Sequence, residues 1–155
     1  MKCESDLYQP VKDWLKDKGF YARAEVMDCD VLAVKEEIAL AVELKMVLNL
    51  EVILQAVNRQ RFSDIVYIAV PKKGRLLFTK RWKQILHLLK RLELGLLLIS
   101  FNKEPATVEE VLEPKPFDRV QSRNISKKKR NSVLAEYHKR HGDHNKGGVN
   151  KTKLV

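Results

Sequence analysis

Three charged residues, Asp30, Glu43 and Lys45, have types and a spacing that could support metal-assisted chemistry. Asp30 opens a short apolar run over 30–34, and Glu43 and Lys45 follow a second apolar run over 38–42. Two carboxylates that converge at the end of a strand bind a hard cation such as Mg²⁺ through oxygen ligands. The ion lowers the pKa of a bound water, and a nearby lysine orients that water or neutralises developing charge. This combination suits the hydrolysis of a phosphodiester.

The two apolar runs are expected to pair as an antiparallel hairpin around a turn centred on Glu36 and Glu37. In that register Asp30 faces Glu43, and directly opposed residues share a face of the sheet and have adjacent Cβ atoms. A three-residue loop would instead place Asp30 opposite Val42 and separate the charged group. The hypothesis therefore depends on the register of one hairpin.

The alternative interpretation of Glu43 and Lys45 is a solvated ion pair at a sheet edge, which is common. Residues 38–42 are apolar at both alternating positions, which is typical of a strand buried on both faces. Charges that leave such a strand need partners or a metal ion. The flanking pattern therefore favours a functional site.

The net charge of +10 is distributed unevenly along the 155 residues. Residues 1–114 hold 18 Lys and Arg against 17 Asp and Glu, whereas residues 115–155 hold 12 against 3. The first part is long and apolar enough for one domain with a real core. The basic end suits a polyanion, most simply nucleic acid, although a solvated basic tail would have the same composition.

Two cysteines, Cys3 and Cys29, make no disulfide framework, and Cys29 is expected to be a small core residue. No signal peptide opens the chain, and the longest apolar stretch, near 94–99, is far too short to span a bilayer. These features predict a reducing, cytoplasmic setting without membrane contact.

Apolar periodicity and capping residues predict an α/β protein with a mixed central sheet flanked by helices. A basic helix is expected over 126–141, after a connector that could contain an edge strand at 107–112. The predicted domains are a core over 1–101, a connector over 102–121, and a basic helical extension with a linker over 122–155. The core elements are helices over 5–18, 49–62 and 82–91 and strands over 20–26, 29–34, 38–45, 65–70 and 94–101.

The order αβββαβ, with Asp on the second strand and Glu-x-Lys on the third, resembles the PD-(D/E)XK nuclease superfamily and its restriction-endonuclease-like core. The resemblance covers residues 4–71. It is most similar to a bacterial family of PD-(D/E)XK-type phosphodiesterases of unknown role, on the run from Glu43-Leu44-Lys45 through Gln55 to Val70-Pro71. Members of that family have a longer C-terminal part, which would continue the polar linker here.

The resemblance implies a divalent-metal-dependent nuclease that hydrolyses nucleic acid, with DNA as the expected substrate, Mg²⁺ or Mn²⁺ as cofactor and a homodimer as one assembly. Asp30 and Glu43 would be metal ligands and Lys45 the catalytic lysine. Glu4 matches an additional acidic ligand, and Gln55 matches a polar residue that faces the site. The sequence departs from the motif because Asp30 follows a cysteine and not a proline.

Two of these residues have ordinary structural alternatives. An acidic residue such as Glu4 is favoured in the first turn of a helix by the helix dipole. Gln55 shares a helix face with Glu51, Asn58 and Arg59, and this face could simply be the solvent side.

The basic segment Lys127-Lys128-Lys129-Arg130 could grip a nucleic-acid backbone without reading its sequence. Three histidines, His138, His141 and His144, recur beside it, but they lack the thiolates or fourth ligand of a closed zinc shell. Single-stranded binding needs stacking aromatic residues, and Tyr137 is alone in this tail. The alternative to an enzyme is a non-catalytic nucleic-acid-binding or regulatory protein on the same fold.

Overall fold

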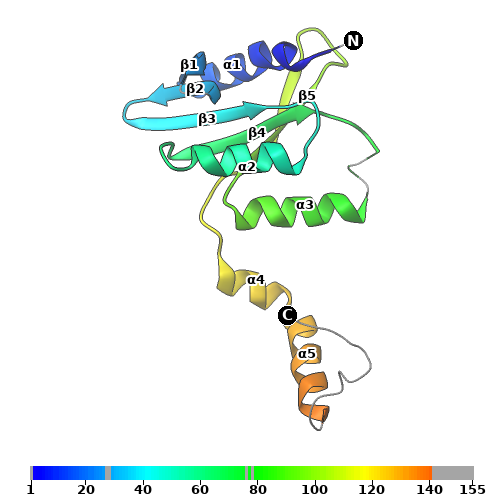
Figure 1. Ribbon diagram of the computed structural model, residues 1–155. Coiled ribbons are helices and arrows are strands. Elements are labelled where there is room, and N and C mark those ends of the chain that lie inside the picture. Colours follow the sequence, from blue (N-terminus) through cyan, green and yellow to red (C-terminus); the bar gives the residue numbers. More distant parts are fainter. Residues whose placement is uncertain (1, 27–28, 76, 78, 141–155) are drawn as a thin grey trace. The chain divides into compact units, whose positions relative to one another are not determined.

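The computed structural model describes residues 2–26, 29–75, 77 and 79–140. The chain divides into two compact units, Met1–Phe117 and Asp118–Val155. The first unit contains the sheet and the helices that cover it (Figure 1). It is an α/β unit, as predicted.

One mixed sheet of six strands, in the spatial order of the sequence, forms the centre of the first unit. The first three strands pair antiparallel, β3 and β4 pair parallel, β4 and β5 pair parallel, and β5 and β6 pair antiparallel. The parallel pairs follow from the helices that connect them, since a parallel connection must cross back over the sheet. The strands are β1 (Tyr21–Val26), β2 (Cys29–Lys35), β3 (Ile38–Leu44), β4 (Ile65–Pro71), β5 (Gly95–Ser100) and β6 (Thr107–Leu112).

The hairpin of β2 and β3 has the register that the charged group requires. Lys35 pairs with Ile38 and Val31 pairs with Val42, so the turn consists of Glu36 and Glu37. Glu36 has a positive φ of 56°, which supplies the left-handed residue that a tight hairpin turn needs. The three-residue loop is therefore excluded.

Helices cover the sheet on both sides (Figure 1). The short 3₁₀ helix η1 (Glu4–Leu7) and α1 (Tyr8–Asp17) cover one face, and α2 (Leu50–Arg59) and α3 (Lys80–Arg91) cover the other. The α1-side cluster consists of Leu7, Val11, Leu15, Val31, Ala33, Leu40, Val42, Leu44, Tyr67, Ala69, Leu97 and Ile99. The α2-side cluster consists of Ala41, Val52, Ile53, Ala56, Val66, Ile68, Val70, Trp82, Leu89, Leu94, Leu96, Leu98 and Leu112.

The helix starts explain two features of the sequence. Pro10 is the third residue of α1, where a missing N–H costs no internal hydrogen bond, because the first four amides of a helix have no partner within it. Asn49 caps α2, as predicted, and its side-chain oxygen accepts from the Val52 N–H at 3.0 Å.

Gly95 lies where β5 passes closest to a buried aromatic ring. A Cβ at this position would lie 2.5 Å from Cδ2 of Tyr67 and 2.9 Å from Cδ of Pro114. Tyr67 is only 6% exposed and cannot move aside. Gly95→Ala should lower the free energy of unfolding by about 1–3 kcal/mol, measured by chemical denaturation.

Gly74→Ala is the matched control for this substitution, because a Cβ there meets nothing within 4 Å. We expect it to change the free energy of unfolding by less than about 0.5 kcal/mol. Equal stability of the two variants would contradict the close packing of Gly95.

The edge strand predicted at 107–112 is β6, which belongs to the first unit. The second unit contains α4 (Arg119–Ile125), which was not predicted, and α5 (Lys127–Lys139), which lies within the helix predicted over 126–141. Neither helix has a buried residue. None of the helices in the described part of the chain is both long and apolar enough to cross a bilayer.

Candidate active site

The side chains of Asp30 and Glu43 lie on the same face of neighbouring strands. Leu32 on β2 and Ala41 on β3 pack with the α2-side cluster, and alternation places Asp30 and Glu43 on that same face. The Oδ2 atom of Asp30 accepts a hydrogen bond from the Leu44 N–H at 2.8 Å, which ties the end of β2 to β3. The two predicted metal ligands are therefore adjacent.

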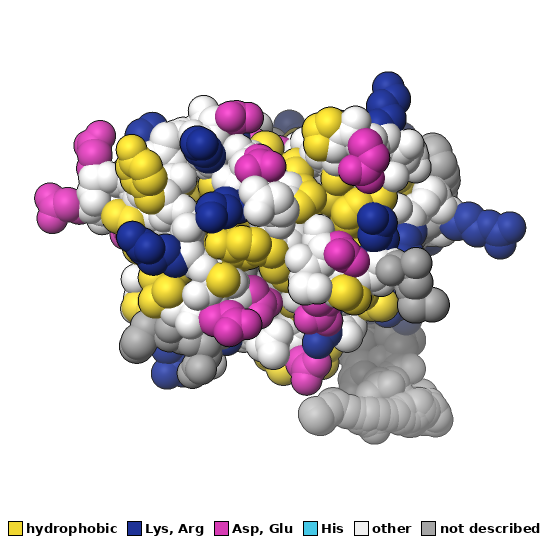
Figure 2. Space-filling model, turned by 90° about the horizontal axis from the view of Figure 1, so that it is seen from above, with side chains coloured by type: hydrophobic (Ala, Val, Ile, Leu, Met, Phe, Trp, Pro, Cys, Tyr) yellow, Lys and Arg dark blue, Asp and Glu magenta, His cyan; other side chains and the backbone are white. Residues whose placement is uncertain are grey.

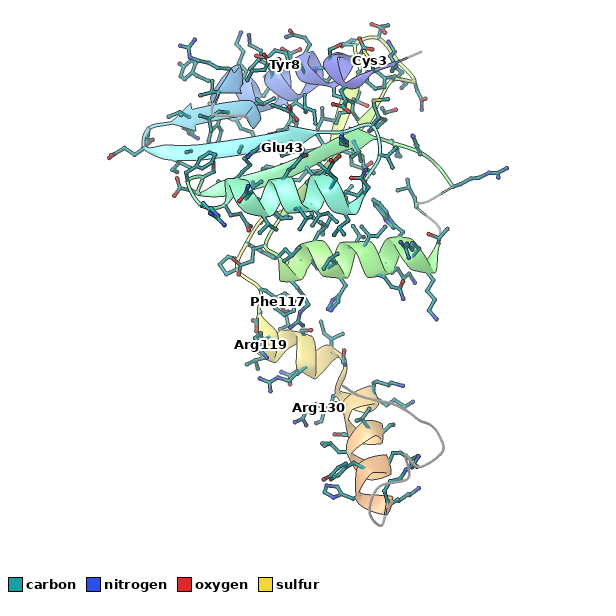
Figure 3. All side chains as sticks on the ribbon, in the orientation of Figure 1. Cys3, Tyr8, Glu43, Phe117, Arg119 and Arg130 are labelled. Carbon is teal, nitrogen blue, oxygen red and sulfur yellow. The ribbon has the colours of Figure 1, made fainter. Side chains whose placement is uncertain are left out.

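Glu43 is a buried carboxylate with a mixed electrostatic environment. Its residue is 2% exposed and lies on β3, on the side of the sheet that α2 covers (Figure 3). Burial raises the pKa of Glu43, and the charge of Asp30 raises it further. The guanidinium of Arg59 opposes both effects, since its Nε donates to Oε2 of Glu43 at 3.2 Å. The raised pKa of Glu43 therefore reflects its burial first and the neighbouring charge of Asp30 second.

Lys45 follows the last residue of β3 and is accessible, with 27% of its side chain exposed. Its Nζ donates to Oε1 of Glu51 at 3.3 Å, and this hydrogen bond is the main reason why the pKa of Lys45 is raised. The negative charges of Glu51, Glu4 and Asp30 act in the same direction. Glu4, on η1, thus contributes to the same electrostatic environment from a different element.

The face of α2 that is turned toward this site carries Glu51, Gln55 and Arg59 at intervals of four residues. Residues with this spacing form one stripe of a helix. The first contacts Lys45 and the last contacts Glu43, so half-buried Gln55 lies between two residues that face the site. The stripe therefore runs from exposed Glu51 through half-buried Gln55 to half-buried Arg59, along the site.

Sequence reasoning missed two contacts of this site, those made by Glu51 and Arg59. Both residues were considered only as neighbours of Gln55 on a helix surface. A signal was present, because a helix that connects two parallel strands runs back over the first of them. The charged residues at four-residue spacing on α2 should therefore have been considered as partners of Glu43 and Lys45.

Asp30 and Glu43 provide the small number of carboxylate ligands that a hard cation such as Mg²⁺ requires. Within residues 2–26, 29–75, 77 and 79–140, no group of three or more His, Cys, Asp or Glu side chains is arranged as a metal site. Mg²⁺ needs only one or two carboxylates, because it keeps several waters. Asp30 and Glu43 meet this requirement, and a cation would relieve the repulsion that raises the pKa of Glu43.

The remaining predicted residues lie elsewhere. Lys127, Lys128, Lys129 and Arg130 form the exposed first turn of α5 in the second unit. His141 and His144 lie outside the described residues.

On the α1 side of the first unit, basic and acidic side chains are interspersed with hydrophobic ones (Figure 2).

The fold and the site define an α/β protein with paired carboxylates and a lysine at the margin of a mixed sheet. Residues 97–155 match the family described as "Putative PD-(D/E)XK phosphodiesterase (DUF2161)". The match confirms the family resemblance, and it covers β5, β6 and the chain beyond them, whereas the motif residues lie in 4–71. No curated protein and no solved structure shows significant similarity to the chain.

Glu43→Gln should stabilise the metal-free protein at neutral pH. The substitution removes a carboxylate that burial and Asp30 disfavour, and the amide oxygen can still accept from Arg59. We expect the midpoint of thermal unfolding to rise by roughly 2–4 °C, measured by calorimetry in EDTA.

The pH dependence of this difference follows from the direction of the pKa shift. Because the folded-state pKa of Glu43 is raised, the wild type loses stability as the pH rises from the ordinary carboxyl range through that pKa. Glu43→Gln lacks this loss, so the advantage should vanish in acid. An advantage that is the same at all pH values would contradict the assignment.

Proposed function

We propose that the chain is a divalent-metal-dependent phosphodiesterase that cleaves nucleic acid, with DNA as its substrate, on a restriction-endonuclease-like core. The observation that supports this most strongly is the pairing of Asp30 with buried Glu43 on one face, beside accessible Lys45. The family match supports the phosphodiesterase class. The order α1, β1, β2, β3, α2, β4 supports the core.

Asp30 and Glu43 would hold Mg²⁺ or Mn²⁺, and Glu4 would add negative charge near Lys45 without completing a group of three ligands. The bound ion would supply a water of lowered pKa and positive charge for the phosphate. Arg59 orients the Glu43 carboxylate through its Nε, and the Leu44 N–H orients that of Asp30. These contacts hold the ligands in place before the ion binds.

Lys45 acts as a cation in this scheme. Its hydrogen bond to Glu51 raises its pKa, so the ammonium stays protonated at neutral pH. It can therefore donate a hydrogen bond to the attacking water or to a phosphate oxygen, and it does not serve as the base. Gln55 lies on the same helix stripe and would supply an uncharged polar group.

The second unit would add affinity for the nucleic-acid backbone. The consecutive cations Lys127, Lys128, Lys129 and Arg130 are all exposed, and no apolar core holds α5. Such a cluster binds phosphates through charge and without sequence preference.

The test is incubation of the protein with plasmid and single-stranded DNA in Mn²⁺, Mg²⁺ or EDTA, beside Lys45→Ala. Cleavage that needs the metal and is lost in the variant is expected. Salt-dependent binding without cleavage under any condition would reject the enzyme and favour the non-catalytic binding protein.

A further inference from the structure

A groove on the sheet lies beside the candidate site and has no part in the chemistry described so far. It has a volume of about 440 Å³ and is lined by Tyr21, Arg23, Val26, Leu32, Val34 and Glu36. Tyr21 pairs with Val34, and Arg23 pairs with Leu32, so these four side chains share one face of β1 and β2.

The described helices of the first unit leave this part of the sheet exposed. Tyr21 is 81% exposed and Val34 is 42% exposed, whereas Ala41 on the next strand is fully buried with the α2-side cluster. Exposed aromatic and aliphatic side chains on a sheet cost free energy in water, and such a surface is typical of a binding site. The groove is therefore open to a ligand.

The groove and the candidate site lie on one continuous surface. Asp30, Leu32 and Val34 alternate along β2 and point to the same side. The four steps along the strand from Asp30 to Val34 span about 13 Å. A chain that lies in the groove would thus run toward the end of β2 that carries Asp30.

We propose that this groove binds a single strand of nucleic acid, in which Tyr21 stacks on an unpaired base and Arg23 contacts a phosphate. The proposal rests on the proposed function, because it names the form of the substrate. A sheet surface with an exposed aromatic ring can stack bases only when they are unpaired. Arg23 carries the charge that a phosphate needs, and Val34 and Leu32 supply apolar contact.

The acidic lining residue, Glu36, sets the direction in which the strand would lie. It is in the hairpin turn beyond Val34, at the end of the groove away from Asp30. This charge disfavours a phosphate at the turn, so the phosphate would contact Arg23, the basic residue that lines the groove.

The experiment measures binding of the full chain in EDTA, without cleavage, by fluorescence anisotropy of a labelled single strand and of the matching duplex. Tyr21→Ala should weaken single-strand binding about 5- to 100-fold and leave duplex binding nearly unchanged. Tyr21→Phe should retain the wild-type affinity, because it keeps the ring.

The salt dependence tests the role of Arg23. Arg23→Ala should reduce the slope of log K against log salt by about 0.7 for the single strand. Arg61→Ala removes the same charge from an exposed position outside the groove and should leave the slope unchanged.

Unchanged single-strand binding in Tyr21→Ala, or an equal loss with duplex, would overturn the proposal. A concentration-dependent dimer that Tyr21→Ala abolishes would also overturn it, since a second copy would then cover the groove. Metal-dependent cleavage is a separate readout, so either idea can fail while the other holds.

Discussion

Asp30→Asn is expected to lower the rate of metal-dependent DNA cleavage about 100- to 10,000-fold while the protein stays folded. The substitution removes one of the two charges that would hold the ion. It keeps an oxygen that can accept from the Leu44 N–H, a hydrogen bond of 2.8 Å in the wild type. The tie between β2 and β3 should therefore persist, and the loss should be chemical.

Asp64→Asn is the matched control for this experiment. Asp64 also accepts a hydrogen bond from β3, from the Ala39 N–H at 2.9 Å, at the opposite end of the strand. The same chemical change there should leave the cleavage rate within about two-fold of the wild type, because it touches no group that binds the ion.

Metal binding itself supplies a second readout that does not depend on turnover. Mn²⁺ should raise the midpoint of thermal unfolding of the wild type and of Asp64→Asn, because it binds the folded state. It should not do so for Asp30→Asn. An equal rise in Asp30→Asn would remove Asp30 from the ligand set.

Arg59→Ala should be the most destabilising change near the site, by about 3–5 kcal/mol at neutral pH. It leaves the buried carboxylate of Glu43 without the guanidinium that now donates to it. Removing the guanidinium costs more than the pair contributes, because it leaves a carboxylate whose charge burial and Asp30 already disfavour. Calorimetry in EDTA should show a midpoint lower by roughly 10–20 °C.

A double-mutant cycle with Glu43→Gln isolates this cause. If the unpaired carboxylate is responsible, Arg59→Ala combined with Glu43→Gln should recover most of the stability. The cost of the single change should also shrink in acid, where Glu43, whose pKa is already raised, takes up a proton.

Arg61→Ala, two residues further along, should be nearly neutral, because that side chain is exposed. A double variant as unstable as Arg59→Ala would assign the effect to lost packing instead of lost charge pairing.

The hairpin illustrates how far local sequence information reaches. Two short apolar runs separated by a polar turn allow few registers, and burial on both faces of β3 restricts them further. That information predicted the order of the elements of the first unit, but it left the register of the hairpin open, and the structure excluded the three-residue loop. Local information was sufficient to find Asn49 as a cap, because capping depends on residues only three positions apart.

Local sequence information could not predict the contacts between helices and strands. Arg59 looks like any charged residue of an amphipathic helix until α2 is laid over β3, where it pairs with Glu43. Tyr21 looks like an ordinary strand aromatic until the helices of the first unit are seen to leave its face of β1 exposed. Spacing along the chain predicts which side chains share a face, but the partner of that face is chosen by packing between residues distant in the sequence, where periodicity carries no signal.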